Sequence, residues 1–88
     1  MKTSFNPNFQ RDVRKTKDKA LRTKLAAVIR EIEAADTLAD VSNIKKLTGY
    51  RNVYRVRVGK YRVGLYCENN EVELVRFLPR KDIYHKFP

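Results

Sequence analysis

The most constraining stretch of the chain runs from Tyr54 to Tyr66 and reads YRVRVGKYRVGLY. Apolar or aromatic side chains alternate with polar ones on both sides of Gly59-Lys60, which is the period expected of β-strands. A two-residue connection that begins with glycine favours a type II′ hairpin turn. The stretch therefore predicts a β-hairpin with Val58 opposite Tyr61, and the rest of the sheet must be built around it.

The same register predicts a cationic sheet face. It places Arg57 directly opposite Arg62, and Arg55 opposite Gly64, which has no side chain. Like charges that face each other across a strand pair oppose folding by up to about 1 kcal/mol. The pattern indicates either an anionic ligand that offsets the repulsion or a basic face that is only solvated, and the hairpin alone does not decide between them.

The charge balance favours a polyanionic or acidic partner. The 88 residues suffice for one domain, and their formal net charge is +10,. Residues 41–88 contribute +7 and residues 1–40 contribute +3, so the excess lies with the hairpin. The only cysteine, Cys67, cannot form an internal disulfide, which is typical of a reducing compartment,. No apolar run reaches transmembrane length and Met1-Lys2 leads into polar sequence, so we expect a cytoplasmic protein without membrane contacts,.

The sequence lacks the residue patterns of common catalytic sites. It has one cysteine, one histidine, no glycine-rich phosphate loop and no carboxylate pair at catalytic spacing. A nucleophile triad built on Cys67 or His85 is therefore excluded. We expect neither a metal ion nor a cofactor.

Two helices are predicted before the hairpin. Asn6 followed by Pro7 is a favourable helix start, and a polar break is expected between Lys15 and Asp18,. A single apolar stripe then marks a second helix that ends near Ala35. The stripe comprises Leu21, Leu25, Val28, Ile29 and Ile32. The two helices should form an antiparallel hairpin; residues 2–5 could add a weak edge strand, and residues 38–47 are read as a connector with a short helical turn.

A third strand is predicted after a type I′ turn at Asn69-Asn70,. It should run from Glu71 to about Leu78 and be ended by Pro79. A uniform register pairs Leu65 with Leu74 and Val63 with Arg76, which leaves Arg76 interrupting the apolar face, near the margin of the sheet.

The same register has consequences for the neighbouring side chains and for the end of the chain. It places Val75 and Phe77 on the arginine face and Leu78 in the core. Residues 80–87 are predicted as a short tail, which the direction of the strand carries toward Arg57 and Arg62. The expected fold is α+β, with an N-terminal helical hairpin packed on a small twisted antiparallel β-sheet.

The ordered set of these pieces resembles the RelE/ParE superfamily of toxins from bacterial and archaeal toxin–antitoxin modules. The matching pieces are LTGYRNVYRVRVGKYRVGLY, which begins at Leu47, and RFLPRKDIY, which ends at Tyr84. The resemblance covers essentially the whole chain as one RelE-like toxin domain, residues 1–88. It implies that the helical hairpin and the sheet form the RelE-like fold. RelE-like members cut mRNA in the ribosomal decoding site, whereas ParE-like members inhibit DNA gyrase and generally lack the nuclease residues.

By position, the resemblance implies catalytic roles for Arg55, Arg57, Arg62, Arg80 and Tyr84. Retention of this set favours a ribosome-dependent mRNA endonuclease, in which a ribose 2′-OH attacks the adjacent phosphate without a metal ion. The implied partners are a cognate antitoxin and mRNA on the ribosome, with contacts to rRNA. A ParE-like gyrase inhibitor and an inactive RNA- or protein-binding module of the same fold remain the alternatives.

The residue that transfers the proton is left open. Many relatives have a histidine where this chain has Pro79, so Tyr84 and His85 are both candidates for catalysis. Tyr66 and Phe77 are candidates for stacking on RNA bases, and the alternatives are apolar support of the sheet or contact with the antitoxin. Five further basic residues are expected to bind RNA: Lys45, Lys46, Arg51, Lys60 and Lys81.

Overall fold

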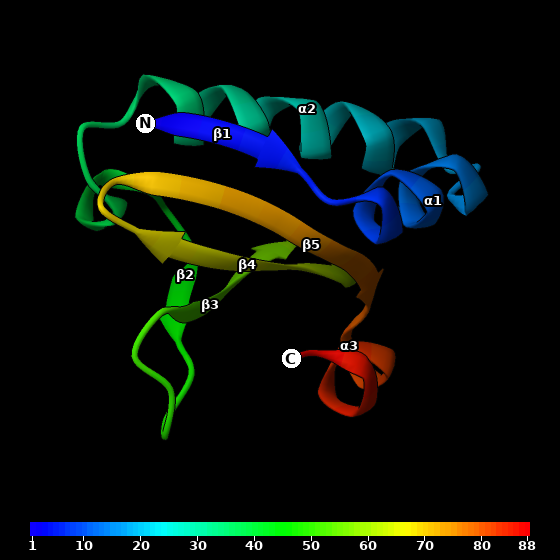
Figure 1. The fold of residues 1–88 in the computed structure, drawn as a ribbon. Helices are drawn as coiled ribbons and strands as arrows, with labels where there is room; N and C mark the ends of the chain where they lie inside the picture. Colours follow the sequence, from blue (N-terminus) through cyan, green and yellow to red (C-terminus); the bar gives the residue numbers. More distant parts are fainter.

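The computed structural model describes all 88 residues as one five-stranded sheet with helices on both faces (Figure 1). The strands lie in the order β1-β5-β4-β3-β2. Helices α1 and α2 cover one face, and α3 lies against the other. The elements are β1 (Lys2–Phe5), α1 (Pro7–Lys15), α2 (Lys19–Ala34), a 3₁₀ turn (Leu38–Asp40), β2 (Ile44–Lys46), β3 (Val53–Val58), β4 (Tyr61–Glu68), β5 (Glu71–Pro79) and α3 (Arg80–Lys86). None of the helices combines the length and the apolarity needed to cross a membrane.

The α+β class is confirmed, but the sheet is mixed rather than wholly antiparallel. The predicted edge strand is present as β1, and it runs parallel to β5. The helix start is also confirmed, since the Asn6 side chain accepts a hydrogen bond from the Asn8 N–H at 2.9 Å,. The expected break separates α1 from α2, and Asp18 caps the second helix by accepting from the Leu21 N–H at 3.1 Å.

The hairpin has the predicted register. Val58 pairs with Tyr61 and Arg57 with Arg62, while Gly64 lies opposite Arg55. Gly59 has φ +59°, which is the positive value that a type II′ turn requires at its first central position,. The valines and the leucine on the helix side of the hairpin pack against the stripe of α2 in the main core, which is the larger of two clusters of buried side chains. This packing confirms the stripe as the buried face of α2.

The register between β4 and β5 differs from the prediction because β5 contains a bulge. Leu65 pairs with Leu74 as expected, but Gly64 then pairs with Arg76, and Val63 pairs with Phe77. Val75 is the extra residue. A bulge of this kind bends the strand and leaves one residue unpaired. The alternating pattern of the sequence does not predict it.

The bulge overturns three predicted side-chain positions. Phe77 is 1% exposed in the main core, not on the arginine face. Leu78 packs instead into a second cluster on the α3 side. Val75 belongs to the same cluster, so it lies on the arginine face as predicted, and it is buried there. Arg76 lies opposite Gly64 and not Val63, so it does not interrupt the apolar face; it lies beyond the residues that pair with β1, at the edge of the sheet as predicted.

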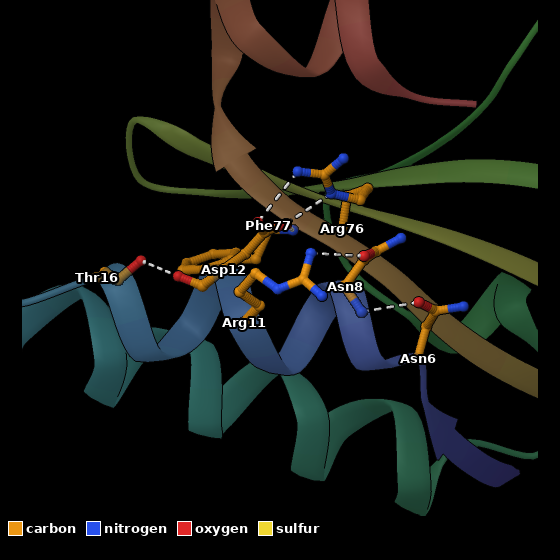
Figure 2. Close-up of polar contacts among 7 residues, drawn as sticks. All are labelled: Asn6, Asn8, Arg11, Asp12, Thr16, Arg76 and Phe77. Atoms are coloured by element: carbon orange, nitrogen blue, oxygen red, sulfur yellow. Dashed lines mark hydrogen bonds and ion pairs between the residues drawn. The ribbon is translucent and has the colours of Figure 1, made fainter.

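Asp12 holds the bulge from the side of α1 (Figure 2). Its carboxylate accepts hydrogen bonds from Arg76 Nε at 2.8 Å, from Arg76 Nη2 at 3.1 Å and from the Phe77 N–H at 2.9 Å. The Asp12 side chain is only 5% exposed. Since β1 ends at Phe5, Asp12 satisfies a β5 backbone donor that no further strand reaches,.

Two segments predicted to be irregular are regular. Residues 44–46 lie in the expected connector, but they form β2, which pairs with β3 so that Lys45 lies opposite Arg55. Three residues are too few to show a strand period. The predicted tail is the helix α3, because Ile83 and Phe87 lie one turn apart and pack against Val53.

Candidate active site

A cavity of about 340 Å³ lies where three strands meet α3. It brings together side chains from segments far apart in the sequence. Its lining consists of Asn43, Lys45, Arg55, Arg57, Arg62, Arg80 and Tyr84. All five residues for which the resemblance implied a catalytic role therefore line one cavity.

Strand alternation presents the hairpin arginines to this cavity. Val56 and Val58 are 1% and 2% exposed in the main core, so Arg55 and Arg57 between and beside them face the opposite side of the sheet,. Arg62 lies directly opposite Arg57 on the next strand. The burial of the valines thus fixes where the guanidinium groups lie.

Local hydrogen bonds orient two of these arginines. Arg57 Nη2 donates to Asn43 Oδ1 at 3.2 Å, and the Arg57 N–H donates to the Asn43 carbonyl at 3.0 Å. Arg62 Nη1 donates to the carbonyls of Tyr61 and Gly59 at 2.9 and 3.2 Å. Asn43 was missed at the sequence level; its φ of +60° is a value that asparagine tolerates, but a single asparagine in a connector is a weak signal,.

Helix α3 supplies the remaining two groups. The Arg80 N–H donates to the Lys60 carbonyl at 3.0 Å, which ties the start of α3 to the hairpin turn. Arg80 Nε donates to the Tyr84 hydroxyl at 3.2 Å, one helical turn away. The Arg55 Cζ lies 4.6 Å from the centre of the Tyr84 ring, within the range of a cation–π contact,. Tyr84 is therefore held between two arginines while half of its surface stays exposed.

The cavity is cationic and no carboxylate lines it. The two salt bridges of the molecule, Lys2–Glu71 and Arg76–Asp12, lie elsewhere. Partial burial, with the charges of neighbouring arginines adding to it, lowers the pKa of Arg62. These conditions favour an anion in the cavity.

The phenol of Tyr84 responds to the same charges. The hydrogen bond from Arg80 is the main cause that lowers the pKa of Tyr84, and the positive charges of Arg80 and Arg55 act in the same direction. Each of these contacts is more favourable with the phenolate than with the phenol.

The other predicted RNA-binding residues divide into two groups. Lys45 lines the cavity, and Lys60 and Lys81 line an adjoining hollow of about 360 Å³ that shares Arg80 and Tyr84 with it. Lys46 lies one residue along β2, paired with Tyr54 on the other face, and Arg51 lies exposed in the loop of residues 47–52. The structure does not bring these last two into either hollow.

Three further candidates lie outside the two hollows. His85 is exposed on α3 and lines neither of them. Phe77 is buried in the main core and cannot stack on a base. Tyr66 packs against Phe87, with ring centres 5.6 Å apart. No group of three or more His, Cys, Asp or Glu side chains is placed to ligate a metal ion. The side chains that line the cavity offer guanidinium, ammonium, amide and phenol groups.

These groups match the chemistry of a phosphodiester. Guanidinium groups bind phosphate oxygens through paired, charge-assisted hydrogen bonds. Fixed cations also stabilise negative charge that develops on such oxygens during a displacement. The cavity could therefore bind a nucleic-acid phosphate and lower the barrier for its cleavage.

Comparisons with known proteins agree over nearly the whole chain. A family model described as the ParE toxin of type II toxin–antitoxin systems, parDE, matches residues 4–84. Toxin RelE3 of Methanocaldococcus jannaschii is 36% identical over 89 residues, which cover both chains completely.

Solved structures give the same result. The RelB–RelE antitoxin–toxin complex from Methanococcus jannaschii contains a chain that matches with a TM-score of 0.81 and 33% identity, over 97% of this chain and 99% of that one. The archaeal RelE–RelB complex from Pyrococcus horikoshii OT3 matches with a TM-score of 0.70 and 19% identity, over 90% and 93% of the chains, which supports the fold alone.

Proposed function

The chain belongs to the RelE/ParE superfamily as a RelE-like toxin of a type II toxin–antitoxin module, and from that premise we propose that it is a ribosome-dependent mRNA endonuclease. One observation carries the proposal. Four arginines and a phenol from two strands and a helix line one cavity that contains no carboxylate.

The proposed reaction is an internal displacement at phosphorus. The 2′-oxygen of a ribose attacks the adjacent phosphate, the bond from phosphorus to the 5′-oxygen of the next nucleotide breaks, and the 2′-OH proton is removed. The departing 5′-oxygen takes up a proton, so the products are a 2′,3′-cyclic phosphate and a 5′-hydroxyl. The phosphate oxygens gather negative charge in the transition state.

The arginines have distinct tasks in this reaction. Arg57 and Arg62 hold the scissile phosphate from opposite strands, and their hydrogen bonds to Asn43 and to the turn carbonyls fix them before the substrate arrives. Arg80 approaches the same cavity from α3. Loss of one such preorganised donor typically lowers the rate by about 10²–10³-fold.

Tyr84 is our candidate for the base that removes the 2′-OH proton. Arginine is a poor base because its pKa exceeds about 12, and His85 lies outside the cavity,. The hydrogen bond from Arg80 and the nearby positive charges lower the pKa of Tyr84, which increases the phenolate fraction near neutral pH. A phenolate within the cavity is placed to accept the proton.

A cognate antitoxin is the second proposed partner. The related toxins from Methanococcus jannaschii and Pyrococcus horikoshii were solved as complexes with RelB. A segment with acidic side chains would neutralise the cavity of this chain and exclude mRNA from it. Because the proposed substrate is mRNA on the ribosome, we place the protein in the cytoplasm.

Gyrase inhibition is the competing function, because the family model that matches is described as a ParE toxin. The two functions separate in one experiment: induce the protein in cells, map the 5′ ends of translated messages, and measure plasmid supercoiling. Cuts in phase with codons support the nuclease, whereas intact messages with relaxed plasmid DNA refute it and support gyrase inhibition. Purified protein with Arg62→Ala should fail to cut ribosome-bound message, while Arg30→Ala, an exposed change on α2, should cut normally.

A further inference from the structure

Helix α3 carries two groups of the cavity but has little to hold it in place. It has seven residues, and isolated helices of that length are not stable in water,. Arg80 and Tyr84 lie one turn apart on the side that faces the cavity. The orientation of this pair must therefore come from contacts on the other side of the helix.

Those contacts form a small cluster separate from the main core. Ile83 is completely buried and Phe87 is 5% exposed, and both pack on Val53 and Val75 from the sheet. The Phe87 N–H donates to the Ile83 carbonyl at 3.0 Å, so the two side chains hold the last turn together. At its start α3 is fixed by the hydrogen bond from Arg80 to the Lys60 carbonyl.

Gly64 provides the space in which Phe87 sits. A Cβ atom on Gly64 would lie 2.6 Å from Phe87 Cγ and Cδ2, and 2.7 Å from Cε2. Non-bonded carbon atoms approach to about 3.5 Å, so any side chain at this position would displace the ring. Gly64 does not have a positive φ, so the backbone there would accept alanine, and the three atoms nearest to an added Cβ all belong to the Phe87 ring.

We propose that Gly64 and Phe87 form a seat that fixes the rotation of α3, and that through it they position Tyr84 and Arg80 in the cavity. The role of Gly64 and Phe87 in catalysis rests on the proposed nuclease function, but the packing of Phe87 on Gly64 and its effect on the position of α3 do not. Neither residue touches the cavity, so both are positioning residues. With the ring seated, the helix presents Tyr84 between Arg55 and Arg80; with the ring displaced, the helix can turn and the phenol leaves its partners.

The test uses the full-length protein with Phe87→Ala, Gly64→Ala and the double variant. The first measurement is the pKa of Tyr84 by NMR of ¹³C-labelled tyrosine, with Tyr84→Phe to assign the signal among five tyrosines. Each single variant should raise this pKa toward the ordinary value of an exposed tyrosine, because the contacts with Arg80 and Arg55 are lost,. Phe5→Ala is the matched control, since Phe5 packs against Phe9 on the opposite face and should leave the pKa of Tyr84 unchanged.

The second measurement is cleavage of ribosome-bound message. Phe87→Ala should lower kcat about 10- to 100-fold and leave KM nearly unchanged, because Arg57 and Arg62 still bind the phosphate from the sheet,. Gly64→Ala should be harmful alone but should add little to Phe87→Ala, because the three atoms nearest to the added Cβ all belong to the ring that Phe87→Ala removes,. If Phe87→Ala does not fold, Phe87→Leu keeps the apolar contact and should show the same changes at smaller size.

The outcomes separate this proposal from the proposed function. An unchanged pKa of Tyr84 in a folded Phe87→Ala protein overturns the seat, and so do additive effects of the two substitutions. A wild-type protein that cuts no message refutes the nuclease, while a raised pKa of Tyr84 in the variants would still support the seat. A normal kcat together with a raised pKa would refute the role of the seat in catalysis.

Discussion

Asp12 offers the sharpest test of how the site is supported, because its buried carboxylate accepts three hydrogen bonds from two residues. Asp12→Ala should lower the free energy of unfolding by about 3 kcal/mol. The substitution leaves Arg76 without a counter-charge and the Phe77 N–H without an acceptor. Both groups lie at the bulge that precedes Arg80.

The expected loss in the free energy of unfolding follows from the burial of the groups that bond to Asp12. Breaking a buried ion pair by removing one member costs about 3–5 kcal/mol, and an unsatisfied buried N–H costs about 1–3 kcal/mol. The Arg76 side chain is 22% exposed, so water can solvate its guanidinium in part, and the total falls near the lower end of the first range. For a domain of this size, about 3 kcal/mol corresponds to a Tm lower by about 12–24 °C.

Thermal and urea unfolding followed by circular dichroism measure this change. Asp12→Asn keeps an acceptor for the Phe77 N–H but loses the charge, so its loss should be intermediate. Glu71→Ala is the matched control, because the Lys2–Glu71 pair spans 3.7 Å between side chains that are 83% and 61% exposed, and such pairs contribute about 0–1 kcal/mol,. A loss below about 1 kcal/mol in Asp12→Ala, or a loss equal to that of Glu71→Ala, would refute the reasoning.

Four further outcomes concern the cavity. Arg62→Ala should lower kcat for ribosome-bound message by about 10²–10³-fold, with Arg30→Ala as the matched charge change outside the site,. Wild-type cleavage should rise with pH and level off above the pKa of Tyr84, which lies below its ordinary value of 10.0, because the phenolate is the active form; Tyr84→Phe should remove this rise. His85→Ala should keep both the rate and the pH profile, since His85 lines neither hollow. If four cations contact single-stranded RNA phosphates, the logarithm of the binding constant should fall with the logarithm of salt concentration with a slope of about −3, and a flat dependence would contradict phosphate-led binding.

The hairpin could be predicted residue by residue because its signal is local. Alternation over thirteen residues and a glycine at the turn leave one register, and the structure has it. The same locality explains the success at Asn69-Asn70, where φ values of +53° and +59° fit the predicted type I′ turn. The direction of the third strand also predicted that Arg80 and Tyr84 come close to Arg57 and Arg62, and the hydrogen bond from Arg80 to Lys60 at the hairpin turn agrees with this. The catalytic roles of these residues came from the family resemblance.

The features that the sequence did not predict share a different physical cause. Each depends on contacts between residues that are far apart in the chain. The bulge at Val75 depends on Asp12, which lies more than sixty residues away in α1. Strand β2 forms because β3 offers it an open edge, and three residues carry no period of their own. Helix α3 needs Gly64 as the place where Phe87 packs, and a glycine inside a strand does not indicate which side chain will cover it.

The main core and the residues proposed for the reaction lie on opposite faces of the sheet. The main core contains thirteen buried residues between the sheet and the helices α1 and α2, whereas the cluster that holds α3 contains four, two of which belong to α3 and its C-terminal cap. On the α3 side, Arg57 and Arg62 repel each other and have no acidic partner, which opposes folding by up to about 1 kcal/mol,. Replacing Arg62 by an uncharged residue relieves that repulsion and leaves no buried charge unpaired, so the variant should remain folded while cleavage is lost. A defect in such a variant therefore reports on the chemistry of the cavity, whereas a defect in α3 reports on both the chemistry and the packing that positions it.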